Sequence, residues 1–123
     1  MNFFKKVEEI KVWQESMILV EVIYQQTNNK YLFRNDYGLI QQMQRAAVSI
    51  PSNIAEGFER GTKKEFVRFL YISKGSCSEL KTQLYLANKL LYIKTNDFVI
   101  IKDKCEKISS MIACLIKVLR KNI

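Results

Sequence analysis

The sequence predicts an all-α protein, an antiparallel up-and-down four-helix bundle in a single domain of residues 1–123. Apolar residues recur every three or four positions in four long segments, and no segment alternates apolar and polar residues as a strand does. One proline and four glycines are too few for a fold built from many loops, and 48% hydrophobic residues can fill a substantial core. The helices are expected at about 8–27, 36–60, 62–92 and 96–120.

The first helix, at about 8–27, has a wide apolar stripe. This stripe offers more apolar surface than the core of a four-helix bundle needs. We therefore expect Val12, Trp13 and Tyr24 to serve also as a subunit interface. The stripe consists of Ile10, Val12, Trp13, Met17, Leu19, Val20, Ile23 and Tyr24.

The second helix, at about 36–60, contains the only proline of the chain, Pro51, within the stretch SIPSNIAEG. Asp36 is a suitable N-cap residue. Apolar residues keep helical spacing on both sides of Pro51, so the proline is expected to kink the helix rather than end it. Gly57 and Gly61 are expected at the C-terminal end, where glycine is favoured.

A polar row accompanies the apolar stripe of this second helix, if the helix continues through Pro51. The spacing 4-4-3-4 favours an internal hydrogen-bonded network that fixes helix register. Glu79 of the third helix is a candidate partner for Arg45 or Asn53. One alternative is a ligand or nucleotide site lined by Arg45, Asn53, Glu56 and Arg60. Another is a catalytic carboxylate pair, Glu56 and Glu79, which lacks an accompanying nucleophile or metal ligand. The polar row consists of Arg45, Ser49, Asn53, Glu56 and Arg60.

The third helix opens with a capping box, Thr62 followed three residues later by Glu65. Gly75 and Ser76 lie in its middle at a cost of about 1 kcal/mol in helix propensity. Close approach of a neighbouring helix would explain this glycine. The fourth helix carries a coiled-coil-like seam with steps of 4-3-4-3-4. The seam consists of Ile101, Cys105, Ile108, Ile112, Leu115 and Leu119.

The chain has a net charge of +8, and its positive charge is concentrated in the C-terminal half. A basic surface favours polyanionic partners such as RNA or DNA, although a charged surface can also serve solubility alone. We expect the basic outer faces of the last two helices to contact phosphates with little sequence readout. The candidate nucleic-acid-binding residues are Lys63, Lys64, Arg68, Lys74, Lys81, Lys89, Lys102, Lys104, Lys107, Lys117, Arg120 and Lys121.

Several functional classes are disfavoured by composition. Histidine is absent, which removes the commonest general base and metal ligand. We therefore expect no enzyme activity, metal, cofactor or small-molecule substrate. Cys77, Cys105 and Cys114 lie among apolar residues and are expected to be reduced core thiols. The sequence also predicts neither a signal peptide nor a membrane span, and hence a cytoplasmic protein.

The stretch Tyr37–Leu90 resembles the four-helix-bundle family of 23S rRNA intervening-sequence proteins, which are bacterial, and with further matches the resemblance covers nearly the whole chain. The resemblance rests on KVWQ (Lys11–Gln14), YGL (Tyr37–Leu39), RAAVSIPSNIAEG (Arg45–Gly57), Arg60, FVRFL (Phe66–Leu70) and GSCSEL (Gly75–Leu80). It implies a four-helix bundle, commonly assembled as a ring-shaped homopentamer, and an association with rRNA suggested by gene context. A more distant similarity is to the accessory variability determinant of diversity-generating retroelements, a basic pentamer that binds nucleic acid and a reverse transcriptase.

Three functions follow as hypotheses. The first is a non-enzymatic, oligomeric, RNA-associated bundle. The second is a protein-interaction scaffold, or an accessory factor of a nucleic-acid enzyme such as a retroelement reverse transcriptase, with the first helix as the contact. The third, an enzyme, is disfavoured because no nucleophile and base pair is evident.

Overall fold

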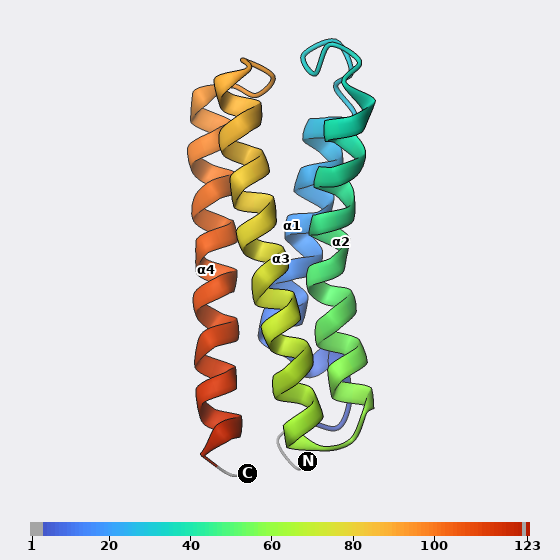
Figure 1. The fold of residues 1–123 in the computed structure, drawn as a ribbon, viewed down its shortest axis with the longest axis vertical. Helices are drawn as coiled ribbons and strands as arrows, with labels where there is room; N and C mark the ends of the chain where they lie inside the picture. Colours follow the sequence, from blue (N-terminus) through green and yellow to red (C-terminus); the bar gives the residue numbers. More distant parts are fainter. Residues whose placement is uncertain (1–3, 122) are drawn as a thin grey trace.

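The computed structural model describes residues 4–121 and 123, and these residues form an all-α protein (Figure 1). Four long helices follow a short 3-10 helix, η1 (Val7–Glu9). Residues 28–36 and 90–94 lie at one end of the bundle, and residues 60–62 lie at the other. The helices are α1 (Lys11–Thr27), α2 (Tyr37–Glu59), α3 (Lys63–Lys89) and α4 (Thr95–Arg120).

The ends of these helices follow local chemistry. The Asp36 side chain accepts a hydrogen bond from the Leu39 N–H at 3.1 Å, and Thr62 Oγ1 accepts one from the Glu65 N–H at 3.2 Å. Both are N-caps of the predicted kind. Two backbone conformations limit the helices. Ile10 is extended, which separates η1 from α1, and Leu91 has a φ of 62°, which ends α3 before residue 92.

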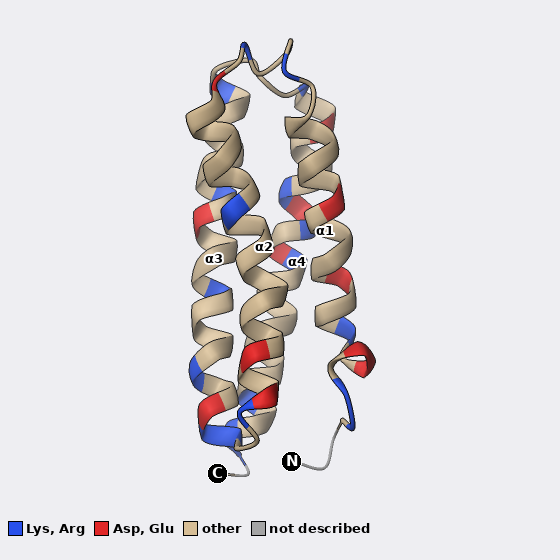
Figure 2. Ribbon diagram, turned by 90° about the vertical axis from the view of Figure 1, so that its right-hand side faces the viewer, with Lys and Arg blue, Asp and Glu red and all other residues tan. Residues whose placement is uncertain are grey.

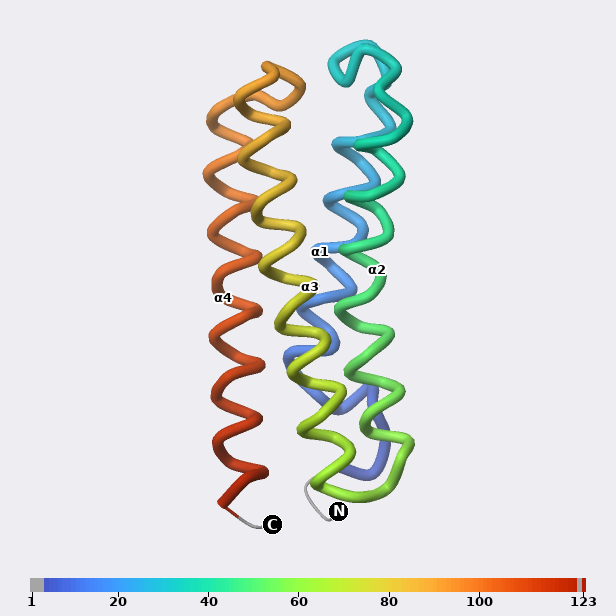
Figure 3. The backbone as a smooth tube through the Cα atoms, viewed as in Figure 1, coloured from blue at the N-terminus to red at the C-terminus, as the bar shows by residue number. Residues whose placement is uncertain are grey.

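The core fills the space between all four helices. Its largest fully buried side chains include Phe33 of the α1–α2 connection and Phe66 at the start of α3. In Figure 3, α1 begins part-way along the bundle, and at 17 residues it is the shortest of the four long helices. None of the helices formed by residues 4–121 combines the length and apolarity needed to cross a membrane.

Pro51 lies inside α2, and the helix continues through it without a break (Figure 1). The backbone around the proline is held by side chains. Ser73 Oγ of α3 donates to the Ile50 carbonyl oxygen at 2.9 Å, and Asn53 Nδ2 donates to the Ser49 carbonyl oxygen at 2.8 Å. Ser73 and Asn53 thus bind carbonyl oxygens close to Pro51 in the sequence. The SIPSNIAEG stretch is part of α2, and the bond from Ser73 ties it to α3.

Two expectations about glycine were wrong. Gly57 is not a terminal glycine: it is buried inside α2, and a Cβ there would lie 2.6 Å from Phe69 Cβ. Gly75, in contrast, is exposed and has open space around it. The close approach between α2 and α3 therefore depends on Gly57. Gly61, with a φ of 85°, is the residue that follows the end of α2.

Candidate nucleic-acid interface

The polar row of α2 divides into two parts in the structure. Ser49 and Asn53 are half-buried and face α3: Ser49 Oγ lies 2.9 Å from Ser76 Oγ, and Asn53 Nδ2 donates to Ser49 Oγ at 2.9 Å. These two members of the predicted network are hydrogen-bonded to each other and, through Ser49, to Ser76 of α3, which the sequence did not indicate. The other members of the row lie outside it.

Glu56 and Arg60 form an exposed ion pair, with 3.3 Å between Oε1 and Nη2. Arg45 and Glu79 are exposed, and the side chain of neither forms a hydrogen bond or ion pair with any residue in the described part of the chain. The predicted partnership of Glu79 with Arg45 or Asn53 was therefore wrong. Because these charges are dispersed over the surface, the row does not gather as a ligand site, and Glu56 and Glu79 do not pair.

The candidate cations of α3 and α4 occupy different places along the bundle. Figure 2 shows Lys and Arg at the end where α3 begins and α4 finishes. Lys63, Lys64 and Arg68 lie on the first turns of α3 at that end, whereas Lys89 lies on its last turn. Arg68 forms an ion pair with Glu65, with 2.9 Å between Nε and Oε2, and its Cζ atom lies 4.7 Å from the centre of the Phe69 ring. Lys89 is thus separated from Lys63, Lys64 and Arg68 by most of the length of α3.

A groove between α3 and the C-terminal turns of α4 brings several candidates together. It has a volume of about 420 Å³. Arg120 Nη1 donates to the Tyr71 hydroxyl across it at 2.9 Å, and Lys74 lies one turn further along α3. Lys117, Arg120 and Lys121 are exposed. Its lining residues, none of them acidic, are Tyr71, Ala113, Ile116, Lys117, Arg120 and Lys121. We call this groove the Tyr71–Arg120 groove.

Further along the same side, lysines are paired with carboxylates. Lys81 Nζ lies 2.7 Å from Glu106 Oε2, and Lys102 Nζ lies 3.6 Å from both Glu106 and Asp103. The hydrogen bond with Lys81 lowers the pKa of Glu106, and the same bond raises the pKa of Lys81. These pairs reduce the positive potential in the middle of the α3–α4 side.

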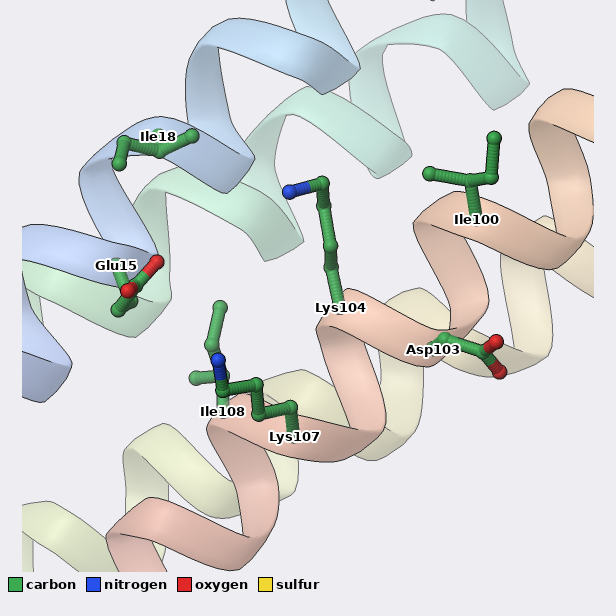
Figure 4. A pocket seen from close by; sticks show the side chains of 7 residues that line it. All are labelled: Glu15, Ile18, Ile100, Asp103, Lys104, Lys107 and Ile108. Atoms are coloured by element: carbon green, nitrogen blue, oxygen red, sulfur yellow. The ribbon is translucent and has the colours of Figure 1, made fainter.

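Lys104 and Lys107 face a different helix. They line a groove of about 330 Å³ between α4 and α1, together with Glu15 and Ile18 of α1 (Figure 4). The Lys104 side chain extends toward α1 in this view. Because Glu15 and Asp103 also line the groove, these two lysines do not form a purely cationic surface.

The three residues of the candidate subunit interface differ in their exposure. Val12 is 3% exposed and belongs to the core, so its proposed contact role was wrong. Trp13 is half-buried in a groove of about 380 Å³ that also contains Met17 and Val48, which are exposed. Tyr24 is exposed in a neighbouring groove.

The interpretation of the sequence overlooked Met17 and Val48 as surface residues. Met17 was assigned to the core stripe of the first helix, although it lies two positions before buried Leu19. Each residue of an α-helix is rotated by about 100° from the one before it, so two residues that are two positions apart lie about 200° apart around the helix axis.

One of the three cysteines departs from expectation. Cys77 and Cys105 are buried core thiols, whereas Cys114 is exposed on α4. Across residues 4–121 and 123, histidine, cysteine, aspartate and glutamate side chains form no group of three that could hold a metal ion.

Comparison with known proteins identifies the family. The sequence pattern of the 23S rRNA-intervening sequence proteins matches residues 8–114, which is most of the chain. The chain belongs to this family. The resemblance noted from KVWQ, SIPSNIAEG and GSCSEL is thereby confirmed. No curated protein matches the chain.

Among solved structures, the chain is similar to a protein of unknown function from the S23 ribosomal protein family of Bacteroides thetaiotaomicron. The TM-score is 0.81 at 21% sequence identity, over 86% of this chain and 98% of the other. At this identity the likeness supports the fold of this 23S rRNA-intervening sequence family member, and its function is argued below from its own residues.

Proposed function

We propose that this protein is a non-enzymatic, RNA-associated bundle that binds RNA through the Tyr71–Arg120 groove. The observation that carries this proposal is the hydrogen bond from Arg120 to the Tyr71 hydroxyl, in a groove with two further lysines and no acidic lining residue. The other grooves that contain candidate lysines also contain Asp or Glu. The Tyr71–Arg120 groove is therefore the place on α3 and α4 where a polyanion meets the least repulsion.

The residues of this groove suit the chemistry of an RNA strand. Lys117, Arg120 and Lys121 supply donors for phosphate oxygens, and such contacts position a strand without reading its sequence. Tyr71 is 49% exposed and offers a ring on which an unpaired base can stack. Arg120, held by the tyrosine hydroxyl, is oriented before the ligand arrives. The groove thus combines backbone contacts with one stacking position.

We further propose that the chain, as an antiparallel up-and-down bundle, assembles into a ring-shaped homo-oligomer, a pentamer by family resemblance. The apolar groove containing Trp13, Met17 and Val48 supports self-association, and its proposed occupant is a second copy of the chain. Several copies in one ring would present several Tyr71–Arg120 grooves to one RNA, which raises avidity. The proposed location is the cytoplasm, where rRNA is found, and no cofactor or small-molecule substrate is invoked.

The test compares two double variants of α4 that remove the same charge. Lys117→Gln with Lys121→Gln alters the Tyr71–Arg120 groove, and Lys104→Gln with Lys107→Gln alters the α1–α4 groove. Binding of a structured rRNA fragment should weaken by at least about tenfold in the first variant, because each lost charge-assisted hydrogen bond contributes about 1.5–3 kcal/mol. It should change much less in the second. Equal losses in both, or no binding by the wild type, would overturn the proposal.

A protein-interaction scaffold is the second candidate, and the same Trp13 groove favours it. It predicts a partner protein that remains bound after nuclease treatment. A reverse transcriptase of a retroelement is one class of partner, because the more distant relatives noted above serve as its accessory factors. Loss of the partner in Met17→Glu, with RNA binding intact, would favour the scaffold over the RNA-associated bundle.

A further inference from the structure

Two thiols face each other across the α3–α4 interface. Cys77 of α3 and Cys105 of α4 are each 1% exposed, and the Cys105 thiol donates to the Cys77 carbonyl oxygen at 3.2 Å. Both side chains also line the same groove between α3 and α4. They are thus adjacent in space although 28 residues apart in sequence.

This thiol pair lies at the base of a small polar groove. The groove has a volume of about 260 Å³ and is lined by Lys81, Glu106, Ser109 and both cysteines. A space of this size admits a molecule as small as hydrogen peroxide. Because both cysteines line this groove, a small oxidant can approach their sulfur atoms from the α3–α4 side.

The surroundings make the two thiols unequal. A hydrogen bond from the Cys77 thiol to the Cys105 sulfur lowers the pKa of Cys105, and Lys81 lowers it further. The same hydrogen bond, together with burial, raises the pKa of Cys77. Since the thiolate is the nucleophile in sulfur chemistry, Cys105 is the thiol that reacts first, and Cys77 is the resolving thiol.

We propose that Cys77 and Cys105 are an oxidative modification site, at which a hydroperoxide converts the two thiols into a disulfide that joins α3 to α4. Cys105 Sγ, after losing its proton to water, attacks one peroxide oxygen. The O–O bond breaks, and the leaving hydroxide takes up a proton, which leaves a sulfenic acid on Cys105. Cys77 Sγ then attacks this sulfur, its thiol proton leaves with the hydroxyl group as water, and the S–S bond forms. With hydrogen peroxide, two thiols and one peroxide give one disulfide and two waters.

The disulfide would restrain the unfolded chain. It closes a loop of about 29 residues, for which chain entropy predicts a rise in melting temperature of roughly 10 °C for a domain of this size. The juxtaposed thiols of the folded protein should also react faster than the same thiols in the unfolded chain, where they are far apart on average. Cys114 takes no part, because it is exposed on α4 and lines none of the groove.

The experiment treats the full chain with hydrogen peroxide in a Cys114→Ser background, which prevents cross-linking between copies through Cys114. Mass spectrometry should find the loss of two hydrogens, and peptide mapping without reductant should find Cys77 joined to Cys105. The melting temperature should rise by roughly 10 °C and return to its starting value with dithiothreitol. A Cys77→Ser, Cys114→Ser variant should form no disulfide and show no rise.

Three results would overturn the proposal. One is that both thiols stay titratable after peroxide treatment of the folded protein. The second is that Cys105 advances to sulfinic acid without joining Cys77. The third is that the disulfide forms faster in urea than in the native protein, which would show that the fold separates the two thiols instead of bringing them together.

Discussion

Ser49 and Ser76 meet across the interface of α2 and α3, with 2.9 Å between their Oγ atoms. Asn53 completes the arrangement by donating to Ser49 from one turn along α2. These contacts place the polar part of the SIPSNIAEG stretch inside the bundle, against the GSCSEL stretch of α3. The most distinctive polar residues of the sequence therefore join α2 to α3 by hydrogen bonds, and we expect these bonds to fix the register of the two helices.

Ser49→Ala should lower the free energy of unfolding by about 1–2 kcal/mol. The change removes one of the two hydrogen-bond partners of buried Ser76 and one of the two acceptors of half-buried Asn53. Urea denaturation followed by circular dichroism measures it. Ser52→Ala, at an exposed position of the same helix, is the matched control and should change stability by no more than about 0.5 kcal/mol. Equal effects of the two substitutions would contradict a register-fixing role.

Gly57→Ala and Gly75→Ala should change stability in opposite directions. A methyl group at Gly57 would lie 2.6 Å from Phe69 Cβ, so α2 and α3 must separate at a cost of about 1–3 kcal/mol. Gly75 has open space and a helical backbone, so alanine there should stabilise the protein by up to about 1 kcal/mol. Thermal unfolding of both variants measures the difference. A stable Gly57→Ala protein would show that the two helices are not closely packed at this position.

Sequence reasoning predicted the helices well and the surface less well. Hydrophobic spacing predicted four helices, and the caps at Asp36 and Thr62 formed as expected. Periodicity places a residue on a face of its helix, but it does not show how far a neighbouring helix covers that face. For this reason Val12 was expected at the surface and is buried, and the close approach expected at Gly75 occurs at Gly57.

The candidate cationic site shows the same limit. The sequence predicted that the last two helices carry the positive charge, and the three cations of the Tyr71–Arg120 groove, Lys117, Arg120 and Lys121, were all among the candidates. Lys81 is paired with Glu106, which lies on a different helix. The sequence alone does not show such a pair, so it did not distinguish Lys81 from Lys117 as a candidate. Tyr71 of α3 lies beside the basic last turn of α4. An aromatic residue expected next to a basic turn of the adjacent helix was the signal that could have indicated it.

The ion pair of Glu106 with Lys81 should make part of the stability depend on acid pH. Hydrogen bonding to Lys81 lowers the pKa of Glu106 in the folded state. A carboxyl group with a lowered folded-state pKa contributes stability above its unfolded pKa and loses it as the pH falls through the folded-state value. Glu106→Gln should therefore flatten the fall in melting temperature between about pH 5 and pH 3.

Glu79→Gln is the control for this measurement, because Glu79 is also exposed on the bundle but forms no ion pair among residues 4–121 and 123. Its acid profile should follow that of the wild type. Parallel profiles for Glu106→Gln and the wild type would contradict a contribution of the Glu106 pair to stability.

Met17→Glu should disrupt the proposed ring without unfolding the subunit. Met17 is 43% exposed in the groove that contains Trp13, so a carboxylate there stays solvated in the monomer but would be buried between copies. Light scattering after size-exclusion chromatography should show a smaller assembly, with unchanged helix content by circular dichroism. Gln25→Glu, which adds the same charge at another exposed position of α1, should leave the assembly intact. An unchanged assembly in Met17→Glu would place the contact between copies elsewhere.

The central claim is that RNA binds the Tyr71–Arg120 groove through its phosphates, and the salt dependence of binding tests it most directly. The logarithm of the affinity of the wild type for a structured rRNA fragment should fall linearly with the logarithm of the salt concentration, with a slope of about −0.9 for each phosphate contact. The slope for Lys117→Gln with Lys121→Gln should be smaller by about 1 for each lysine that contacts a phosphate. The slope for Lys104→Gln with Lys107→Gln should remain close to that of the wild type. Weak binding that is flat in salt, or identical slopes for all three proteins, would contradict the claim.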